Sequence, residues 1–298
     1  MHPAAFLATI AGGAVWLCGC AGAAPLPAKA LALNRAGAEA LARGDLETAD
    51  ARFSLALEYS PRFVEALVNQ GLVELQRGNF DRARELITRA RRLNPDVAQP
   101  HHALGILAER RARPDEASRH YYDALAVDPG FAPARANLAR LLFDAGMLEE
   151  AQLQFKRLAE AAPDSPEAPL GLAETLLRLG RVDEAEAVTR SACERFPDTP
   201  ELVVLAARSQ LRRGNVAHAI ELLAPLGYGR DDVAASALSW LATAELLRGD
   251  PQSAVGAAKR ALSLEPSSAV ATYAMAQALE ALGDPAAITW QRRARAIR

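Results

Sequence analysis

The chain of 298 residues carries 34 Lys and Arg against 36 Asp and Glu, which gives a formal net charge of -2. Half of the residues are hydrophobic and only 5% are aromatic; most of the apolar residues are Ala and Leu, which favour closely packed helices. This charge balance excludes the strong positive field with which proteins attract polyanions, so we expect no nucleic-acid partner. The three cysteines, Cys18, Cys20 and Cys193, fit neither a disulfide framework nor a paired metal-binding pattern.

The first residues have the pattern of an export signal. The apolar run from Ala4 to Gly19 is too short to span a bilayer of about 30 Å, and small residues follow it. We therefore predict a signal peptide of the lipoprotein type over residues 1–19. Residues 20–29, which include Pro25 and Pro27, are predicted to form a short tether.

The segment Leu17-Cys18-Gly19-Cys20 resembles a bacterial lipobox, which ends in the cysteine that is acylated. The resemblance implies lipidation of Cys20 and an anchor in a membrane. Because Ala21 rather than Asp follows that cysteine, it also implies sorting to the periplasmic face of the outer membrane. The alternative is a periplasmic protein released by cleavage near residues 21–24.

Four kinds of residue then recur with a spacing of 34, with one extra residue before the seventh repeat. The proline column consists of Pro61, Pro95, Pro129, Pro163, Pro197 and Pro266. The alanine column consists of Ala49, Ala83, Ala117, Ala151, Ala185, Ala219 and Ala254. The turn column consists of Gly44, Gly78, Ala112, Gly146, Gly180, Gly214, Gly249 and Gly283. The small-residue column consists of Gly37, Gly71, Gly105, Ala139, Ala173, Ala207, Ala242 and Ala276. Four columns in one phase indicate an array of repeats.

Each column has a mechanical explanation in a pair of antiparallel helices. The small-residue and alanine columns allow the two helices to approach closely where they cross. The turn column supplies the left-handed residue that closes the first helix, and the proline ends the second. Large apolar residues are expected to fill the space between hairpins, namely Phe53, Ile87, Tyr121, Phe155 and Leu223.

The period and the columns resemble the tetratricopeptide repeat family, whose repeat is a helix–turn–helix of 34 residues. The resemblance implies an all-α fold, an α-solenoid that winds as a right-handed superhelix of about eight hairpins. We place seven repeats over residues 30–268 and a partial repeat or C-terminal cap over 269–298. The seven repeats are 30–63, 64–97, 98–131, 132–165, 166–199, 200–234 and 235–268. The sixth lacks its proline and contains Gly227-Tyr228-Gly229, so we expect a bend or a loosened hairpin there.

In this family the first helix of each repeat lines a concave groove, which implies a surface for an extended or helical segment of a protein partner. Apolar and aromatic anchors would supply affinity, while Asn and Arg side chains would hold the partner's backbone. The predicted groove residues are Asn34, Val68, Asn69, Leu72, His102, Ile106, Asn137, Arg140, Phe143, Leu177, Arg208, Leu211, Arg212, Trp240 and Tyr273. The alternative is that these residues only pack against adjacent helices. The cations with which some family members clamp a carboxylate are absent around Asn69 and Asn137, so we do not expect that clamp.

No catalytic or metal-binding motif accompanies the repeats. His101 and His102 are adjacent, and neighbouring residues on a helix point about 100° apart, which disfavours a shared metal. We therefore predict a protein that is not an enzyme and that has no metal, cofactor or small-molecule substrate.

The leading functional hypothesis is a protein–protein interaction scaffold of the bacterial cell envelope. Its architecture is similar to that of the tetratricopeptide lipoproteins of type IV pilus biogenesis, which implies a role in assembling a pilus or secretion machine. The alternative is an adaptor or regulator of an envelope enzyme, such as a peptidoglycan hydrolase or a protease.

Overall fold

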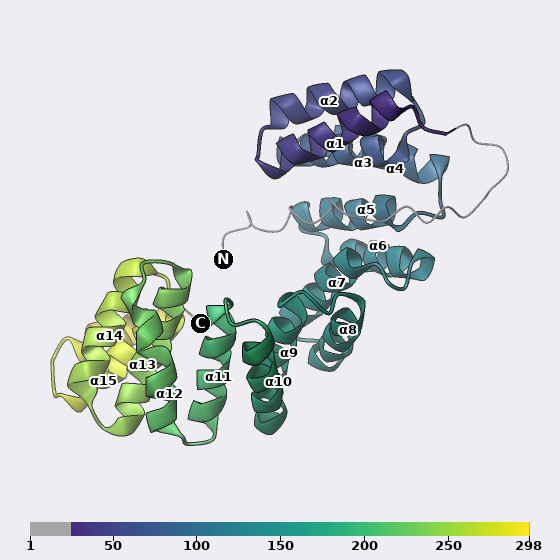
Figure 1. Ribbon diagram of the computed structural model, residues 1–298. Helices are drawn as coiled ribbons and strands as arrows, with labels where there is room; N and C mark the ends of the chain where they lie inside the picture. Colours follow the sequence, from purple (N-terminus) through teal and green to yellow (C-terminus); the bar gives the residue numbers. More distant parts are fainter. Residues whose placement is uncertain (1–24, 298) are drawn as a thin grey trace. The chain divides into compact units, whose positions relative to one another are not determined.

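The computed structural model describes residues 25–297, and all regular structure in that range is helical (Figure 1). These residues form sixteen α-helices and one short 3₁₀ helix, and helices that follow one another in the chain pack against each other as hairpins. The predicted all-α fold, a solenoid of about eight helix–turn–helix repeats, is therefore confirmed. The predicted signal peptide, Cys20 and the tether up to residue 24 lie outside the described residues.

The helices fall into two compact units, divided after Leu141 inside α7. The first unit holds α1 (Ala28–Ala42), α2 (Leu46–Tyr59), α3 (Val64–Gln76), α4 (Phe80–Leu93), α5 (Ala98–Arg110), α6 (Pro114–Val127) and the start of α7 (Ala132–Asp144). The second unit holds α8 (Leu148–Ala161), α9 (Glu167–Arg178), α10 (Val182–Arg195), α11 (Pro200–Arg212), α12 (Val216–Leu223), α13 (Asp232–Arg248), α14 (Pro251–Leu264), α15 (Ala269–Ala281) and α16 (Ala287–Ala296). Within the described range, no helix is both long and apolar enough to cross a bilayer.

The turn column determines where the first helix of each hairpin ends. All seven of its glycines have positive φ angles, as a left-handed closing residue requires. The remaining position holds Ala112, which adopts the same left-handed conformation with a φ of 55° although it has a Cβ atom. The backbone geometry of the turn is thus retained where the glycine is missing, at the cost of local strain.

We expect Ala112→Gly to raise the free energy of unfolding by about 0.5–1 kcal/mol, because it removes this strain. Gly146→Ala is the matched reverse change: its φ is 77° and an added Cβ would meet nothing within 4 Å, so only the backbone conformation is altered. Urea unfolding followed by circular dichroism measures both changes. Equal stability of Ala112→Gly and the wild type would show that the turn carries no strain.

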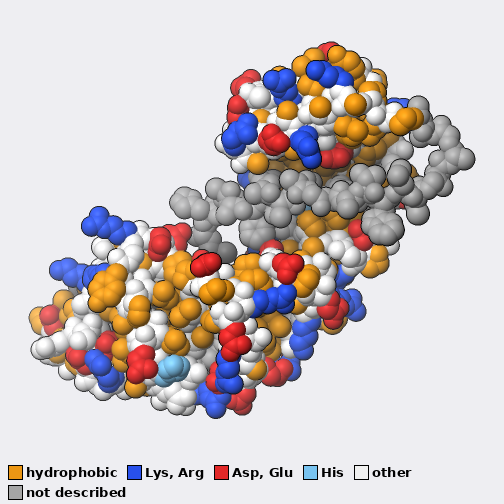
Figure 2. Space-filling model, viewed as in Figure 1, with side chains coloured by type: hydrophobic (Ala, Val, Ile, Leu, Met, Phe, Trp, Pro, Cys, Tyr) orange, Lys and Arg blue, Asp and Glu red, His pale blue; other side chains and the backbone are white. Residues whose placement is uncertain are grey.

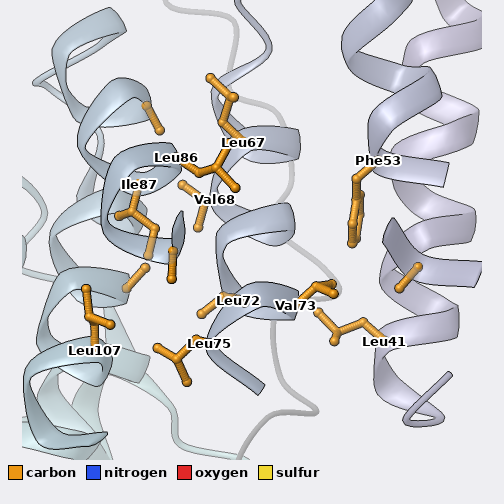
Figure 3. Packing of buried hydrophobic residues seen from close by; sticks show 14 of the residues in the cluster. Leu41, Phe53, Leu67, Val68, Leu72, Val73, Leu75, Leu86, Ile87 and Leu107 are labelled. Carbon is orange, nitrogen blue, oxygen red and sulfur yellow. The ribbon is translucent and has the colours of Figure 1, made fainter. Parts of the chain in front are cut away.

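The large apolar side chains between repeats form the core, as the sequence predicts. Phe53, Ile87, Tyr121 and Leu223 are fully buried, and Phe155 is nearly so. In the first unit, Figure 3 shows Ile87 among Leu67, Leu72, Leu75, Leu86 and Leu107, in a cluster to which α1–α5 contribute.

The small-residue column explains how these side chains fit. An added Cβ at Gly37 would lie 2.6 Å from Cε1 of Phe53, and one at Gly105 would lie 2.3 Å from Cε1 of Tyr121. Such distances are too short for carbon atoms in contact. Glycine at these positions therefore lets an aromatic ring lie directly against the backbone of the first helix.

The sixth repeat departs from the regular hairpin. Its second helix, α12, has only eight residues and continues into the 3₁₀ helix Pro225–Tyr228, and Tyr228 is 83% exposed. The irregularity expected at this repeat is therefore present as a shortened second helix.

Candidate protein-binding surface

Two asparagines of the predicted groove form a buried polar ladder within the first unit. Asn69 of α3 donates from Nδ2 to Oδ1 of Asn34 on α1 over 3.1 Å, and Asn34 donates to Oε1 of Glu65 over 2.9 Å. Both asparagines are only 4% exposed. A buried amide is stable only when it is hydrogen-bonded, and here the neighbouring repeat supplies the bond. Asn69 thus packs between helices and leaves no surface for a partner's backbone.

His102 on α5 is also buried rather than exposed in a groove. Its ring packs beside the rings of Tyr121 and Phe131, with centroids 5.8 and 5.5 Å away. Burial lowers the pKa of His102 to about 4. Its Nε2 atom lies 3.0 Å from Nδ2 of Asn137, an atom that can only donate, so Nε2 accepts and the imidazole is neutral. His102 therefore belongs to the packing between repeats.

The buried polar network continues from Asn137 to the surface of the first unit. Asn137 also donates to the hydroxyl of Tyr121 over 3.3 Å, and Arg140 donates to Glu109 over 2.6 Å. Burial, and then the nearby carboxylate of Glu109, raise the pKa of Tyr121. The network links the three helices α5, α6 and α7.

In the first unit the structure thus removes five of the predicted groove residues from the candidate surface. Asn34, Val68, Asn69, Leu72 and His102 are buried, and Val68 and Leu72 belong to the hydrophobic core. Ile106 is partly buried against the same core. The physical reason is that side chains at these positions of the first helix face the first helix of the neighbouring repeat, which covers them.

In the second unit, by contrast, predicted groove residues converge on an open surface. Side chains of α9, α11 and α13, the first helices of three successive hairpins, surround a hollow of about 170 Å³. We call it the Trp240 hollow. It is lined by Leu177, Arg208, Leu211, Arg212, Trp240, Thr243 and Leu247.

The Arg208 side chain is fixed in place on one wall of this hollow. Its guanidinium carbon lies 4.7 Å from the centroid of the Trp240 ring, and Nη2 donates to Oε1 of Glu174 over 2.8 Å. A second bond joins Nη1 of Arg208 to the other carboxylate oxygen of Glu174. The bidentate pair orients the guanidinium, and the guanidinium in turn orients the indole ring.

Arg212 differs from Arg208 although both line the hollow. Arg212 is exposed at the end of α11 and has no hydrogen bond or ion pair to any residue of the described range. On the neighbouring helix α9, Arg178 occupies the equivalent position, 34 residues earlier. The Arg178 guanidinium lies 4.6 Å from the centroid of the Phe143 ring and donates to the Phe143 carbonyl over 3.2 Å. The surface therefore combines an apolar hollow with exposed guanidinium groups.

Tyr273, the last of the predicted groove residues, lies at a different hollow of the second unit. That hollow, of about 210 Å³, is formed by α15 and α16, and its lining includes Gln277, Glu280 and Arg295. Tyr273 is 55% exposed. It therefore does not line the Trp240 hollow.

The sequence prediction missed two residues of the Trp240 hollow, Thr243 and Leu247. Leu247 is 60% exposed and lies at the rim. It follows Arg212 by 35 residues instead of 34, because one residue is inserted in the sixth repeat. Counting the inserted residue aligns Leu247 with Arg178 and Arg212 and would have identified it.

A cluster of ionisable side chains lies on α5 and α6. The Nδ1 atoms of His101 and His120 lie 3.9 and 3.7 Å from Oδ2 of Asp123, and neither Nδ1 atom has a hydrogen bond. Within residues 25–297, no three His, Cys, Asp or Glu side chains are placed so that they could hold a metal ion.

The surface charges are mixed. Figure 2 shows Lys and Arg side chains interspersed with Asp and Glu on the visible face of each unit, without a basic stripe.

Comparisons with known proteins agree with the repeat architecture. Sequence models described as tetratricopeptide repeat match residues 62–130, 110–168, 149–202, 204–269 and 269–287, which together cover well over half of the chain. Among curated proteins, no sequence matches significantly.

Solved structures with similar folds come from different biological settings. The chain resembles the Cut9–Hcn1 hetero-tetramer of the APC/C with a TM-score of 0.64 and 19% identity, over 89% of this chain and 52% of that one. It resembles PilW, a type IV pilus biogenesis factor, with a TM-score of 0.60 and 23% identity, over 71% of this chain and 99% of PilW. It resembles PilF of Pseudomonas aeruginosa with a TM-score of 0.59 and 21% identity, over 72% of this chain and 97% of PilF. At these identities the likeness concerns the fold alone.

Proposed function

Since this chain belongs to the tetratricopeptide repeat family, we propose that it is a non-enzymatic scaffold that binds a protein partner through the Trp240 hollow. The observation that carries the proposal is the convergence of Arg208, Arg212 and Trp240 on one open, mainly apolar surface. Trp and Arg are the residues that most often anchor protein interfaces. The Trp240 ring is already oriented by Arg208, so its ordering costs little on binding.

We place the scaffold in the bacterial cell envelope, exported by the signal peptide and anchored to the periplasmic face of the outer membrane through Cys20. The support is the lipobox-like segment Leu17-Cys18-Gly19-Cys20. A single acyl chain holds a protein only weakly, so stable anchoring needs the several chains of a mature lipoprotein.

We expect Cys20→Ser to abolish acylation and to release the protein from the membrane fraction. Cys18→Ser is the matched control, because it removes the neighbouring thiol and leaves the proposed acceptor intact. Incorporation of a labelled fatty acid, followed by membrane fractionation, distinguishes the two variants. Labelling that survives in Cys20→Ser would refute Cys20 as the acylated residue, and a wild type that is neither labelled nor found in the membrane fraction would indicate a periplasmic protein.

We further propose that the partner is a component of a pilus or secretion machine. The support is the combination of a lipoprotein-like leader with a repeat array whose fold resembles PilW and PilF. Fold alone does not specify function, so the partner has to be identified by capture.

A photo-crosslinking residue at Leu247, on the rim of the hollow, is expected to capture the partner in living cells. The same probe at Leu153 on α8 is the control, since Leu153 is an exposed leucine on a second helix. Adding Trp240→Ala should abolish capture from Leu247 without affecting the helical content. A pilus or secretion component among the products supports assembly, whereas a cell-wall hydrolase or protease would assign the adaptor role. Capture only from Leu153 would contradict binding at the hollow.

A further inference from the structure

The charges around the Trp240 hollow are unbalanced. Its lining includes two arginines and no acidic residue. Arg208 is neutralised by Glu174, which lies just outside the hollow. Arg212 has no carboxylate partner within the described range, and Arg178 contacts only the ring and carbonyl of Phe143 there. Two cations on one apolar surface therefore lack counter-charges.

The repeat register determines how far apart these two cations lie. Arg178 and Arg212 end α9 and α11, which pack against each other as first helices of successive repeats. The axes of packed helices are about 8–10 Å apart. An extended peptide advances about 3.3 Å per residue, so it covers this distance in about three residues.

We infer that the partner presents to the Trp240 hollow an extended acidic segment, in which an apolar side chain contacts Trp240 and two carboxylates about three residues apart pair with Arg178 and Arg212. This inference rests on the proposed function and adds the chemistry of the partner to it. The apolar side chain lies against Leu211 and Leu247, the leucines of the hollow that remain partly exposed. The carboxylates supply the charges that the surface lacks, and each exposed pair contributes up to about fivefold in affinity.

This site differs in position from the carboxylate clamp of some family members. The residues around Asn69 that would form the clamp lie in the body of the first helices and include no cations. Arg178 and Arg212 lie in the last turn of their helices, beside an apolar hollow. Recognition here needs internal acidic side chains and an apolar neighbour rather than a free chain terminus.

The test is selection of a random peptide library on the purified full-length chain and on charge-altered variants. The wild type should enrich peptides with an apolar residue and Asp or Glu about three residues apart. The Arg212→Glu variant should enrich peptides that carry Lys or Arg in place of one of the two acidic residues. It should bind the peptides selected on the wild type roughly tenfold more weakly. The control variant Arg157→Glu makes the same charge reversal at an exposed position on α8, and it should select the same peptides as the wild type. Circular dichroism confirms that each variant is folded.

The outcomes separate this inference from the proposed function. If Trp240→Ala abolishes selection but Arg212→Glu selects the same peptides as the wild type, the hollow binds a partner and the acidic specificity is refuted. If peptides are enriched but bind Trp240→Ala equally well, both proposals fail, as they do if no peptide is enriched. Binding of a wild-type peptide should also weaken as salt rises, since exposed ion pairs are screened. Affinity independent of salt would contradict the two ion pairs.

Discussion

Replacement of Tyr121 by alanine is expected to lower the free energy of unfolding by about 3–5 kcal/mol, the usual cost of deleting a buried aromatic ring. The ring is fully buried and lies against the backbone at Gly105, where no other side chain can fill the space. Its hydroxyl also accepts a hydrogen bond from Asn137. The deletion therefore leaves a cavity and removes one of the two acceptors of the Asn137 amide, which keeps only His102.

Tyr121→Phe separates these two contributions. The variant keeps the ring and removes only the hydroxyl, so we expect a loss of about 1–2 kcal/mol. Urea unfolding gives the total loss, and hydrogen exchange of α5 and α6 shows whether it is confined to this hairpin, as expected when repeats contact only their neighbours. An equal loss in the alanine and phenylalanine variants would mean that the ring does not support the packing of the hairpin.

Local requirements explain why the helices and turns could be predicted from the sequence. A turn after a first helix needs a residue with positive φ, and this need is visible as a glycine at a fixed interval. A ring that packs on the backbone needs a residue without a Cβ atom, which is visible at Gly37 and Gly105. Such requirements are met within one hairpin, so the period alone reveals them.

The candidate surface was only partly predictable because it depends on contacts between repeats. A residue on a first helix faces either the surface or the neighbouring first helix, and the period does not distinguish these cases. Asn34 and Asn69 are 35 residues apart, as are His102 and Asn137. Both pairs are hydrogen-bonded. A separation of 35 residues between two polar residues, one more than the repeat period, is the signal that indicates a buried ladder instead of a groove.

His102 is expected to make the first unit less stable as the pH falls from about 6.5 to about 4. An ordinary histidine has a pKa of 6.5, while burial lowers the pKa of His102 to about 4. The unfolded chain therefore binds a proton throughout this range and the folded protein does not, so acid favours unfolding. The stability provided by the neutral imidazole is complete above pH 6.5 and is lost progressively below it. The shift corresponds to a loss of about 3 kcal/mol at the lower end.

His102→Gln is the variant that isolates this effect, because glutamine can accept the hydrogen bond from Asn137 and does not titrate. The difference in unfolding free energy between wild type and variant should shrink by about 3 kcal/mol from neutral pH to about pH 4. Other groups cancel in this difference, including His120 and the carboxyls of Asp45 and Asp250, whose pKa values are also lowered. If the His102→Gln difference is instead constant with pH, the imidazole is charged or solvated in the folded protein, and the buried network from His102 through Asn137 to Tyr121 does not exist in solution.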